Sequence, residues 1–241
     1  MRSLVVVGSL AACGRVGFSP ATDGNPADQA VDQNRPIAPP TFVQTDSYGA
    51  GSNAVATLAM PAPVTAGNMI LVAIDIVPGT GVTVTVSDDQ LNAYTVLGPF
   101  DGIADVRHFL AYAFAQRSGP TTVTSTLSSR PADYHDLRLH EYAGTSATDP
   151  IEATASATGT SQTLDGARSG FVTTTEPNEL IFGFGTYSGR GDAGSGFTLR
   201  SSFDFDLTED RVAPTPGPYE AVSTLTTGSN WMMTVAAIRG R

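Results

Sequence analysis

The feature that most constrains the fold is a succession of short apolar runs that begins at Thr41. These runs are rich in Val, Thr, Ile, Tyr and Phe, and they are separated by Gly, Pro, Asn and Asp. Such a pattern is typical of β-strands joined by turns. Some runs alternate strictly: Val123, Ser125 and Leu127 share one face of their strand, and the threonines between them share the other. No stretch keeps a 3.6-residue apolar period over a dozen residues, so the sequence predicts an all-β fold.

We expect a single domain over residues 41–241, folded as an antiparallel β-sandwich with jelly-roll topology, because many short strands in two sheets must protect their edges. The polar segment 154–166 is expected to be a loop. The expected strands are Thr41–Thr45, Ala54–Met60, Met69–Val77, Val82–Ser87, Ala93–Leu97, Val106–Gln116, Thr121–Ser128, Leu137–Ala143, Gly170–Thr174, Glu179–Tyr187, Phe197–Phe203, Tyr219–Thr226 and Trp231–Arg239.

The N-terminus has the organisation of a secretory signal. Arg2 precedes an apolar run from Leu4 to Leu10, and two alanines follow before Cys13, the only cysteine in the chain. The sequence Leu-Ala-Ala-Cys at 10–13 resembles the lipobox of bacterial lipoproteins, in which the signal is cut before the cysteine and the cysteine is acylated. The resemblance implies a signal peptide over residues 1–12, lipidation of Cys13 and a membrane as partner. A buried strand at 4–7, a secreted protein without lipid and a misassigned start codon are the alternatives.

The residues that follow Cys13 suggest where such an anchor would place the protein. Residues 13–18, Cys-Gly-Arg-Val-Gly-Phe, are similar to the start of many myxobacterial surface lipoproteins. By analogy with Gram-negative sorting, Gly14 in place of Asp implies the outer membrane. Residues 13–40 are polar, acidic and rich in proline, so we expect a lipidated, disordered tether between the anchor and the domain.

Charge and composition exclude several classes of protein. All 13 basic residues are arginine, against 23 acidic residues, which gives a formal net charge of −10. Such a surface repels phosphates, so we expect no nucleic-acid partner. No apolar run approaches the 18 residues or so of a membrane span. A single cysteine cannot form an intramolecular disulfide, so stability must come from packing.

The order of several short motifs resembles a secreted sandwich module of bacterial surface proteins. The resemblance covers roughly residues 55–241, and its motifs are structural. The module has no agreed activity, so the resemblance supports a fold and a location without naming a reaction. The motifs are Ala66-Gly67-Asn68-Met69-Ile70-Leu71-Val72, Val86-Ser87-Asp88, Asn92-Ala93-Tyr94 and Glu141-Tyr142-Ala143-Gly144.

No pattern of a catalytic nucleophile is present. The sequence lacks Gly-x-Ser-x-Gly, and only His108, His135 and His140 could act as a base. His135 and His140 are five residues apart, so on a strand without a bulge they point to opposite faces and cannot chelate zinc together. We therefore expect satisfied or exposed histidines and no catalytic residues.

Carboxylates are numerous, but none stands out as half of a catalytic pair. The candidates are Asp75, Asp88, Asp89, Glu141, Glu179, Asp204 and Asp206. Alternation places Glu141 on the inward face with Leu137 and Leu139. A buried carboxylate needs partners, so we expect either a pair with an arginine such as Arg138 or Arg107, or a bulge that turns Glu141 outward.

Two sets of residues are candidates for ligand binding. Four carboxylates lie within seven residues, at Asp204, Asp206, Glu209 and Asp210. We expect a solvated acidic loop there, with a structural calcium site as the alternative. No other cofactor is expected. The second set is Tyr48, Tyr187 and Tyr219, which lie near strand ends where they could stack on sugars. Trp231 alternates with Met233 and Val235 and is expected in the core.

These expectations combine into one functional hypothesis with two alternatives. The hypothesis is a lipid-anchored, non-catalytic module of the cell envelope that binds or coats, with an extracellular glycan or protein as partner. One alternative is a carbohydrate-active hydrolase that uses paired carboxylates. The other is a passive envelope component without a ligand.

Overall fold

The computed structural model describes residues 36–77, 81–102, 105–161, 166–225 and 229–241. The expected signal peptide, Cys13 and the tether up to residue 35 lie outside the described residues. Residues Ile37 to Arg241 form one compact unit. Among the residues described, no helix is long and apolar enough to cross a membrane.

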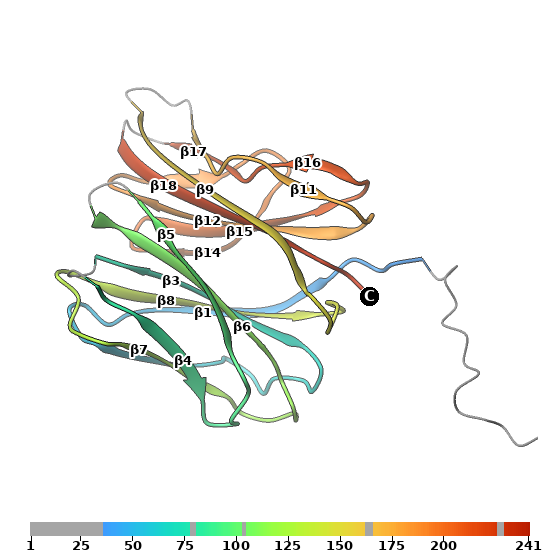
Figure 1. The fold of residues 1–241 in the computed structure, drawn as a ribbon, viewed down its shortest axis with the longest axis horizontal. Coiled ribbons are helices and arrows are strands. Elements are labelled where there is room, and N and C mark those ends of the chain that lie inside the picture. The colour runs from blue at the N-terminus through green and yellow to red at the C-terminus, as the bar shows by residue number, and fades with distance from the viewer. Residues whose placement is uncertain (1–35, 78–80, 103–104, 162–165, 226–228) are drawn as a thin grey trace, which may run out of the picture. The chain divides into compact units, whose positions relative to one another are not determined.

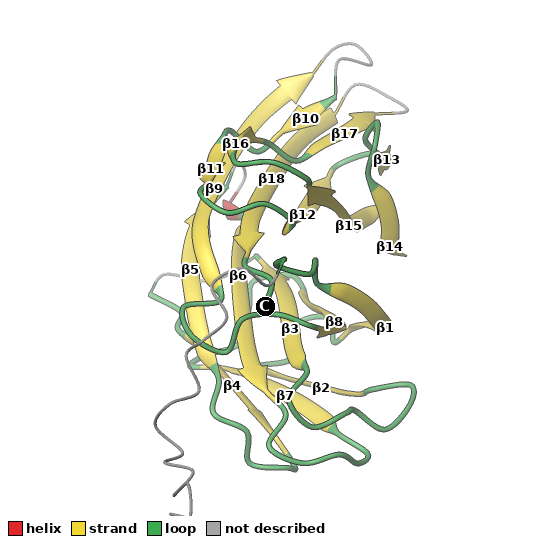
Figure 2. Cartoon of the chain, turned by 90° about the vertical axis from the view of Figure 1, so that its right-hand side faces the viewer, coloured by secondary structure: helices red, strands yellow, loops and turns green. Residues whose placement is uncertain are grey.

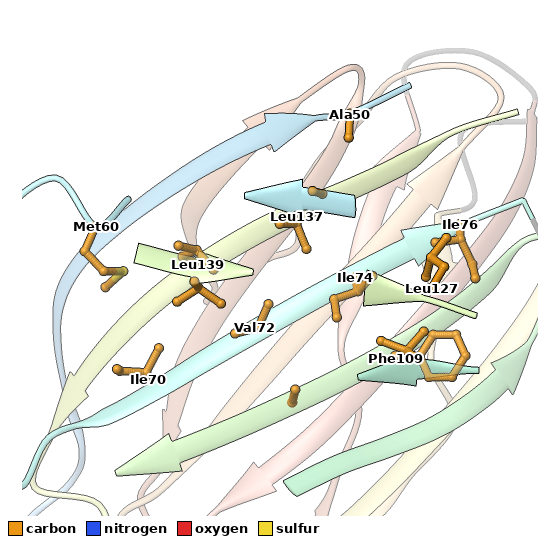
Figure 3. Close-up of a cluster of buried hydrophobic side chains, with 14 of the residues drawn as sticks. Ala50, Met60, Ile70, Val72, Ile74, Ile76, Phe109, Leu127, Leu137 and Leu139 are labelled. Atoms are coloured by element: carbon orange, nitrogen blue, oxygen red, sulfur yellow. The ribbon is translucent and has the colours of Figure 1, made fainter. Parts of the chain in front are cut away.

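The first part of the compact unit is a two-sheet sandwich. Its strands are β1 (Thr41–Gly49), β2 (Val55–Ala59), β3 (Met69–Ile76), β4 (Val84–Asp88), β5 (Thr95–Asp101), β6 (Arg107–Phe114), β7 (Thr122–Leu127) and β8 (His135–Ala143). One antiparallel sheet has the order β1-β8-β3-β6-β5, and it packs on a second sheet of order β2-β7-β4. Figure 3 shows part of the core between them, where Ile70, Val72 and Ile74 meet Leu137 and Leu139.

The second part repeats this arrangement. Its strands are β9 (Ile151–Ser161), β10 (Ala167–Arg168), β11 (Val172–Thr174), β12 (Glu179–Tyr187), β13 (Gly191–Ala193), β14 (Thr198–Phe203), β15 (Asp206–Ala213), β16 (Gly217–Tyr219), β17 (Val222–Leu225) and β18 (Ser229–Ile238). The main sheet has the order β9-β18-β12-β15-β14 and packs on the sheet β10-β17-β13, with β11-β16 as an added ribbon.

Both sandwiches have the strand order of a jelly roll. When the ribbon β11-β16 is set aside and the strands of each half are numbered from one to eight, both main sheets read 1-8-3-6-5 and both smaller sheets read 2-7-4. In a jelly roll, 1-8-3-6 lies over 2-7-4, and here the fifth strand joins the larger sheet. The predicted all-β class and jelly-roll sandwich are therefore confirmed, and the structure adds that the sandwich occurs twice.

The two main sheets stack face to face, so the chain forms four layers (Figure 1; Figure 2 shows them from the side). The strands β3 and β12 are buried on both faces, which is why they are the most continuous apolar runs. Leu71 and Ala73 of β3 meet Phe182 and Phe184 of β12 in the layer between the sandwiches.

Contacts across this layer follow the repeat. Ala73 pairs with Arg138 and Leu110, and Phe184 pairs with Thr234 and Thr208. Aligning Ala73 with Phe184 therefore makes Arg138 equivalent to Thr234, and the strand positions two residues away make His108 equivalent to Asp206. His108 bonds to Thr234, and Asp206 bonds to Arg138. The interface is thus isologous in the manner of a twofold dimer.

Two long strands were not expected from the sequence. Residues 154–161 of the expected loop at 154–166 belong to the strand β9, which starts at Ile151 and pairs along β18; residues 162–165 of that loop lie outside the described residues. The acidic stretch from Asp206 is the strand β15 and is buried between neighbours, whereas the sequence suggested a solvated loop.

The domain also begins earlier than position 41. Ala38 donates its backbone N–H to the carbonyl of Arg241 (3.1 Å), and Asn178 Nδ2 donates to the carbonyl of Ile37 (2.9 Å). Residues 37–40, which composition assigned to the tether, therefore belong to the folded unit. The chain enters beside its own C-terminus (Figure 1).

Candidate functional site

A pocket of about 250 Å³ opens at one end of the layer between the two sandwiches. The ends of β3 and β12, the start of β18 and the residues before β6 and β8 surround it. We call it the end pocket, and its lining residues are Val77, Val106, Tyr134, Thr186, Tyr187, Ser188, Asn230, Trp231 and Met232. None of these nine residues is Asp, Glu, His, Cys, Lys or Arg. The end pocket is thus mainly apolar with a few polar groups, the usual character of small-molecule sites.

Hydrogen bonds to the buried residues Asp75 and His108 hold the hydroxyl of Thr186, one of the polar residues of the lining. Thr186 Oγ1 donates to Asp75 Oδ2 (3.1 Å) and lies 2.9 Å from His108 Nε2. Because the hydroxyl proton is used on Asp75, Thr186 accepts from a protonated Nε2, and Nδ1 of a neutral His108 accepts from Thr234 Oγ1 (2.9 Å). Burial lowers the pKa of His108 to about 3, against the opposing effect of Asp75, so the imidazole is neutral at physiological pH.

Asp75, the hydrogen-bond partner of Thr186, belongs to a buried network of ionisable side chains. Arg138 is bonded to Asp75 through Nη1, and its Nη2 lies 3.2 Å from Asp206 Oδ2. Burial alone would raise the pKa of Asp75, but the charge of Arg138, aided by its hydrogen bond, lowers it. Burial and the charge of Asp75 raise the pKa of Asp206. Arg138 is therefore flanked by one carboxylate and one carboxylic acid, a charge-balanced arrangement that holds the sandwiches together.

The strands β8 and β15, which carry Arg138 and Asp206, make a second polar contact further along. Tyr142 donates to Asp210 Oδ2 (2.7 Å), and Arg200 Nε donates to the same oxygen (2.8 Å). Between these contacts His140 is fully buried, and neither ring nitrogen has a hydrogen-bond partner. The expectation of satisfied or exposed histidines holds for His108 and His135 but fails for His140.

The four carboxylates suggested for calcium do not converge. Asp204 is exposed in the turn before β15, Asp206 is paired with Arg138, and Asp210 is bonded to Tyr142 and Arg200. Glu209 points to the opposite face of β15, where it accepts the N–H of Gly194 (2.8 Å). Among the described residues, no group of three or more His, Cys, Asp or Glu is placed to hold a metal ion.

The three tyrosines suggested for sugar stacking are also separate. Tyr48 is 42% exposed on the edge strand β1. Tyr187 is buried, and its hydroxyl donates to Ser223 Oγ (2.6 Å) on the side away from the sandwich interface. Tyr219 lies on β16 under the guanidinium of Arg211. They do not form a common platform, and only Tyr187 is part of the end pocket.

Glu141 is buried on the predicted face, but its partners are different from those expected. It accepts from Asn68 Nδ2 (2.7 Å), from the N–H of Thr65 (2.9 Å) and from Gln44 Nε2 (2.5 Å). No arginine of the described part of the chain forms an ion pair with it, and the bulge lies on the neighbouring strand β1, where it brings Gln44 opposite Glu141. Asp88 is likewise structural, because it accepts bonds from Asn92 in the turn after β4.

Most of the end pocket could not be found from the sequence. Val77, Val106 and Tyr134 lie at strand ends in one sandwich, and Met232 lies on β18 in the other. No spacing or motif links them, because the stacking of the sandwiches alone brings them together. Comparisons of the chain with protein-family models, with curated proteins and with solved structures find no match.

Proposed function

We propose that this chain is a lipid-anchored, non-catalytic binding protein of the cell envelope, and that its ligand occupies the end pocket. The observation that carries the proposal is the end pocket itself: a preformed, mainly apolar site of about 250 Å³ without an Asp, Glu, His, Cys, Lys or Arg among its nine lining residues. Binding needs shape and a few polar contacts, and both are present.

The carboxylates that do come together support binding over hydrolysis. Asp75 and Asp206 are 0% and 4% exposed, and both are bonded to Arg138. A glycoside hydrolase needs its acid and base on either side of a substrate bond. A buried pair occupied by an arginine cannot meet that requirement, so hydrolysis is the weaker candidate.

The anchoring part of the proposal rests on the sequence at 10–13 and on the point where the domain starts. Thr41 pairs with Ala143 at the end of β8, whereas Tyr134 of the end pocket precedes the start of β8. The strand has nine residues, so the two ends are separated by about 30 Å. The folded unit therefore begins about one strand length from the end pocket, and we expect the outer membrane as the location if Gly14 sorts as in other lipoproteins.

The proposal can be tested with the full chain in detergent micelles. A thermal-shift screen against a library of small molecules and glycans should find ligands that raise the melting temperature, since a ligand that binds only the folded state stabilises it. The variant Val106→Phe, which fills the end pocket, should lose the shift. If the screen finds no ligand, the passive coat is favoured. Turnover of a glycan would favour the hydrolase.

A further inference from the structure

The end pocket has the size of one ring. Drug-sized ligands occupy pockets of roughly 300–1,000 Å³, and an apolar cavity of about 150 Å³ holds a benzene molecule. The value of about 250 Å³ lies between these cases. It leaves space for a single six-membered ring with a small substituent, and it is too small for an extended chain.

The lining selects against charge. Val77, Val106 and Met232 supply apolar walls, and the hydroxyl of Thr186 is occupied by Asp75 and His108. The ions behind Thr186 already balance one another. A charged ligand would lose its hydration without gaining a partner of opposite sign, and this loss is costly in an apolar site.

The polar groups of the lining are donors. Ser188 Oγ accepts the backbone N–H of Asn230 (2.9 Å), so its own hydrogen is directed elsewhere. Asn230 Oδ1 accepts from Thr160 (2.9 Å), which leaves the amide hydrogens of Nδ2 without an acceptor among the described residues. Burial raises the pKa of Tyr134, so the phenol stays protonated and also donates. A matching ligand carries an acceptor oxygen.

We infer that the end pocket takes a single uncharged aromatic or alicyclic ring that bears a hydroxyl or carbonyl oxygen. The ring lies against Val77, Val106 and Met232, and the oxygen accepts a hydrogen bond from the donors of Ser188, Asn230 or Tyr134. This inference rests on the proposed function, and it narrows the ligand from any small molecule to one chemical class.

Methionine methyl NMR of the full chain provides a direct test. The chain has five methionines, and Met232 lines the end pocket while Met60 and Met69 lie in other cores. Benzyl alcohol should shift the Met232 methyl signal saturably and leave Met60 and Met69 unchanged. Benzoate and benzylamine, which share the ring but carry charge, should bind at least about tenfold more weakly.

Two variants control the test. Val106→Phe should abolish the response to benzyl alcohol, with the Met60 and Met69 signals reporting that the fold is kept. Val55→Phe, at a position 52% exposed on β2, should retain it. Equal binding of a charged probe, or a response to methyl glucoside alone, would overturn the ring inference and leave a binding function in place. Silence from all four probes would also overturn it, and the library screen then decides the proposed function separately.

Discussion

Arg138 of the first sandwich donates a hydrogen bond to Asp206 of the second across the interface, with Nη2 and Oδ2 3.2 Å apart and the two side chains 0% and 6% exposed. Arg138 is also bonded to the fully buried Asp75. One guanidinium therefore compensates carboxyl groups from both sandwiches. Loss of a single partner in a buried network leaves the remaining charge uncompensated, which costs more than the pair itself contributes.

We accordingly expect Arg138→Met to lower the free energy of unfolding by about 3–5 kcal/mol, measured by urea denaturation. The matched control is Arg107→Met. Arg107 pairs with Asp101 at the surface, where the side chains are 30% and 72% exposed, so the loss should stay below about 1 kcal/mol. Similar losses in both variants would contradict a special role for the buried arginine.

Stability should depend on pH through Glu209. Burial, more than any other effect, raises the pKa of this carboxyl from its ordinary 4.5 to about 7. Between these two pKa values the folded state holds a proton that the unfolded state releases. The contribution of Glu209 to the free energy of unfolding is therefore full below pH 4.5 and is lost as the pH rises to 7. Glu209→Gln should reduce this decline by up to about 1.4 kcal/mol per pH unit. Chemical denaturation between pH 4.5 and 7 tests it; Asp101→Asn should leave the slope unchanged.

Gly159 and Trp231 form a cross-strand pair in which the indole covers the glycine. A Cβ at Gly159 would lie 2.4 Å from Cζ2 of Trp231, so any side chain there must displace the ring. We expect Gly159→Val to destabilise the domain by about 1–3 kcal/mol. Trp231 is the only tryptophan, so its emission maximum should shift to the red. Thr158→Val, on the opposite face of β9, should leave the emission as it is.

The first four residues of the domain should contribute to stability. A 37–241 fragment retains the bonds of Ile37 and Ala38 to Asn178 and Arg241, and a 41–241 fragment loses both. Two hydrogen bonds contribute about 1–3 kcal/mol together, so the shorter fragment should melt several degrees lower. Calorimetry of both fragments beside 14–241 is the measurement. A melting temperature of 37–241 well below that of 14–241 would show that residues 14–36 also pack on the domain.

Anchoring is expected to depend on one atom, the sulfur of Cys13. Because the chain has no other cysteine, Cys13→Ser should remove both palmitate labelling and membrane association. Cells fed radiolabelled palmitate, followed by gel autoradiography and fractionation, give both readouts. Ser19→Ala serves as the control and should label normally. Undiminished label in Cys13→Ser would rule out the lipobox interpretation.

Sequence patterns were sufficient where strands contain large apolar residues in regular order. Met69–Ile76 and Glu179–Tyr187 were placed within one residue, because burial on both faces requires continuous apolar runs. The strand β9 was missed because its inward residues, such as Ala153, Ala155 and Gly159, are too small to mark an apolar face. Gly159 has to be small, since Trp231 occupies the space above it.

The strand β15 was missed for the opposite reason. Two of its buried positions are the carboxylates Asp206 and Asp210, and a local pattern cannot show that Arg138, Tyr142 and Arg200 lie opposite them. The repeat was hidden in the same way. His108 and Asp206 occupy equivalent positions, but His108 bonds to Thr234 and Asp206 bonds to Arg138. The two residues therefore differ in type, and the sequence shows no similarity at these positions. The end pocket depends on that stacking, so it too required the three-dimensional structure.

The isologous stacking has a consequence for how the interface can be built. In a dimer of identical chains, a residue near the symmetry axis meets its own copy, so an aspartate would meet an aspartate and the like charges would repel. Asp75 and Thr186 are equivalent positions of the two halves, yet they hydrogen-bond to each other at 3.1 Å. Because both halves belong to one chain, each side of the axis carries a different residue. The association is also intramolecular, so dilution cannot separate the two sandwiches that form the end pocket.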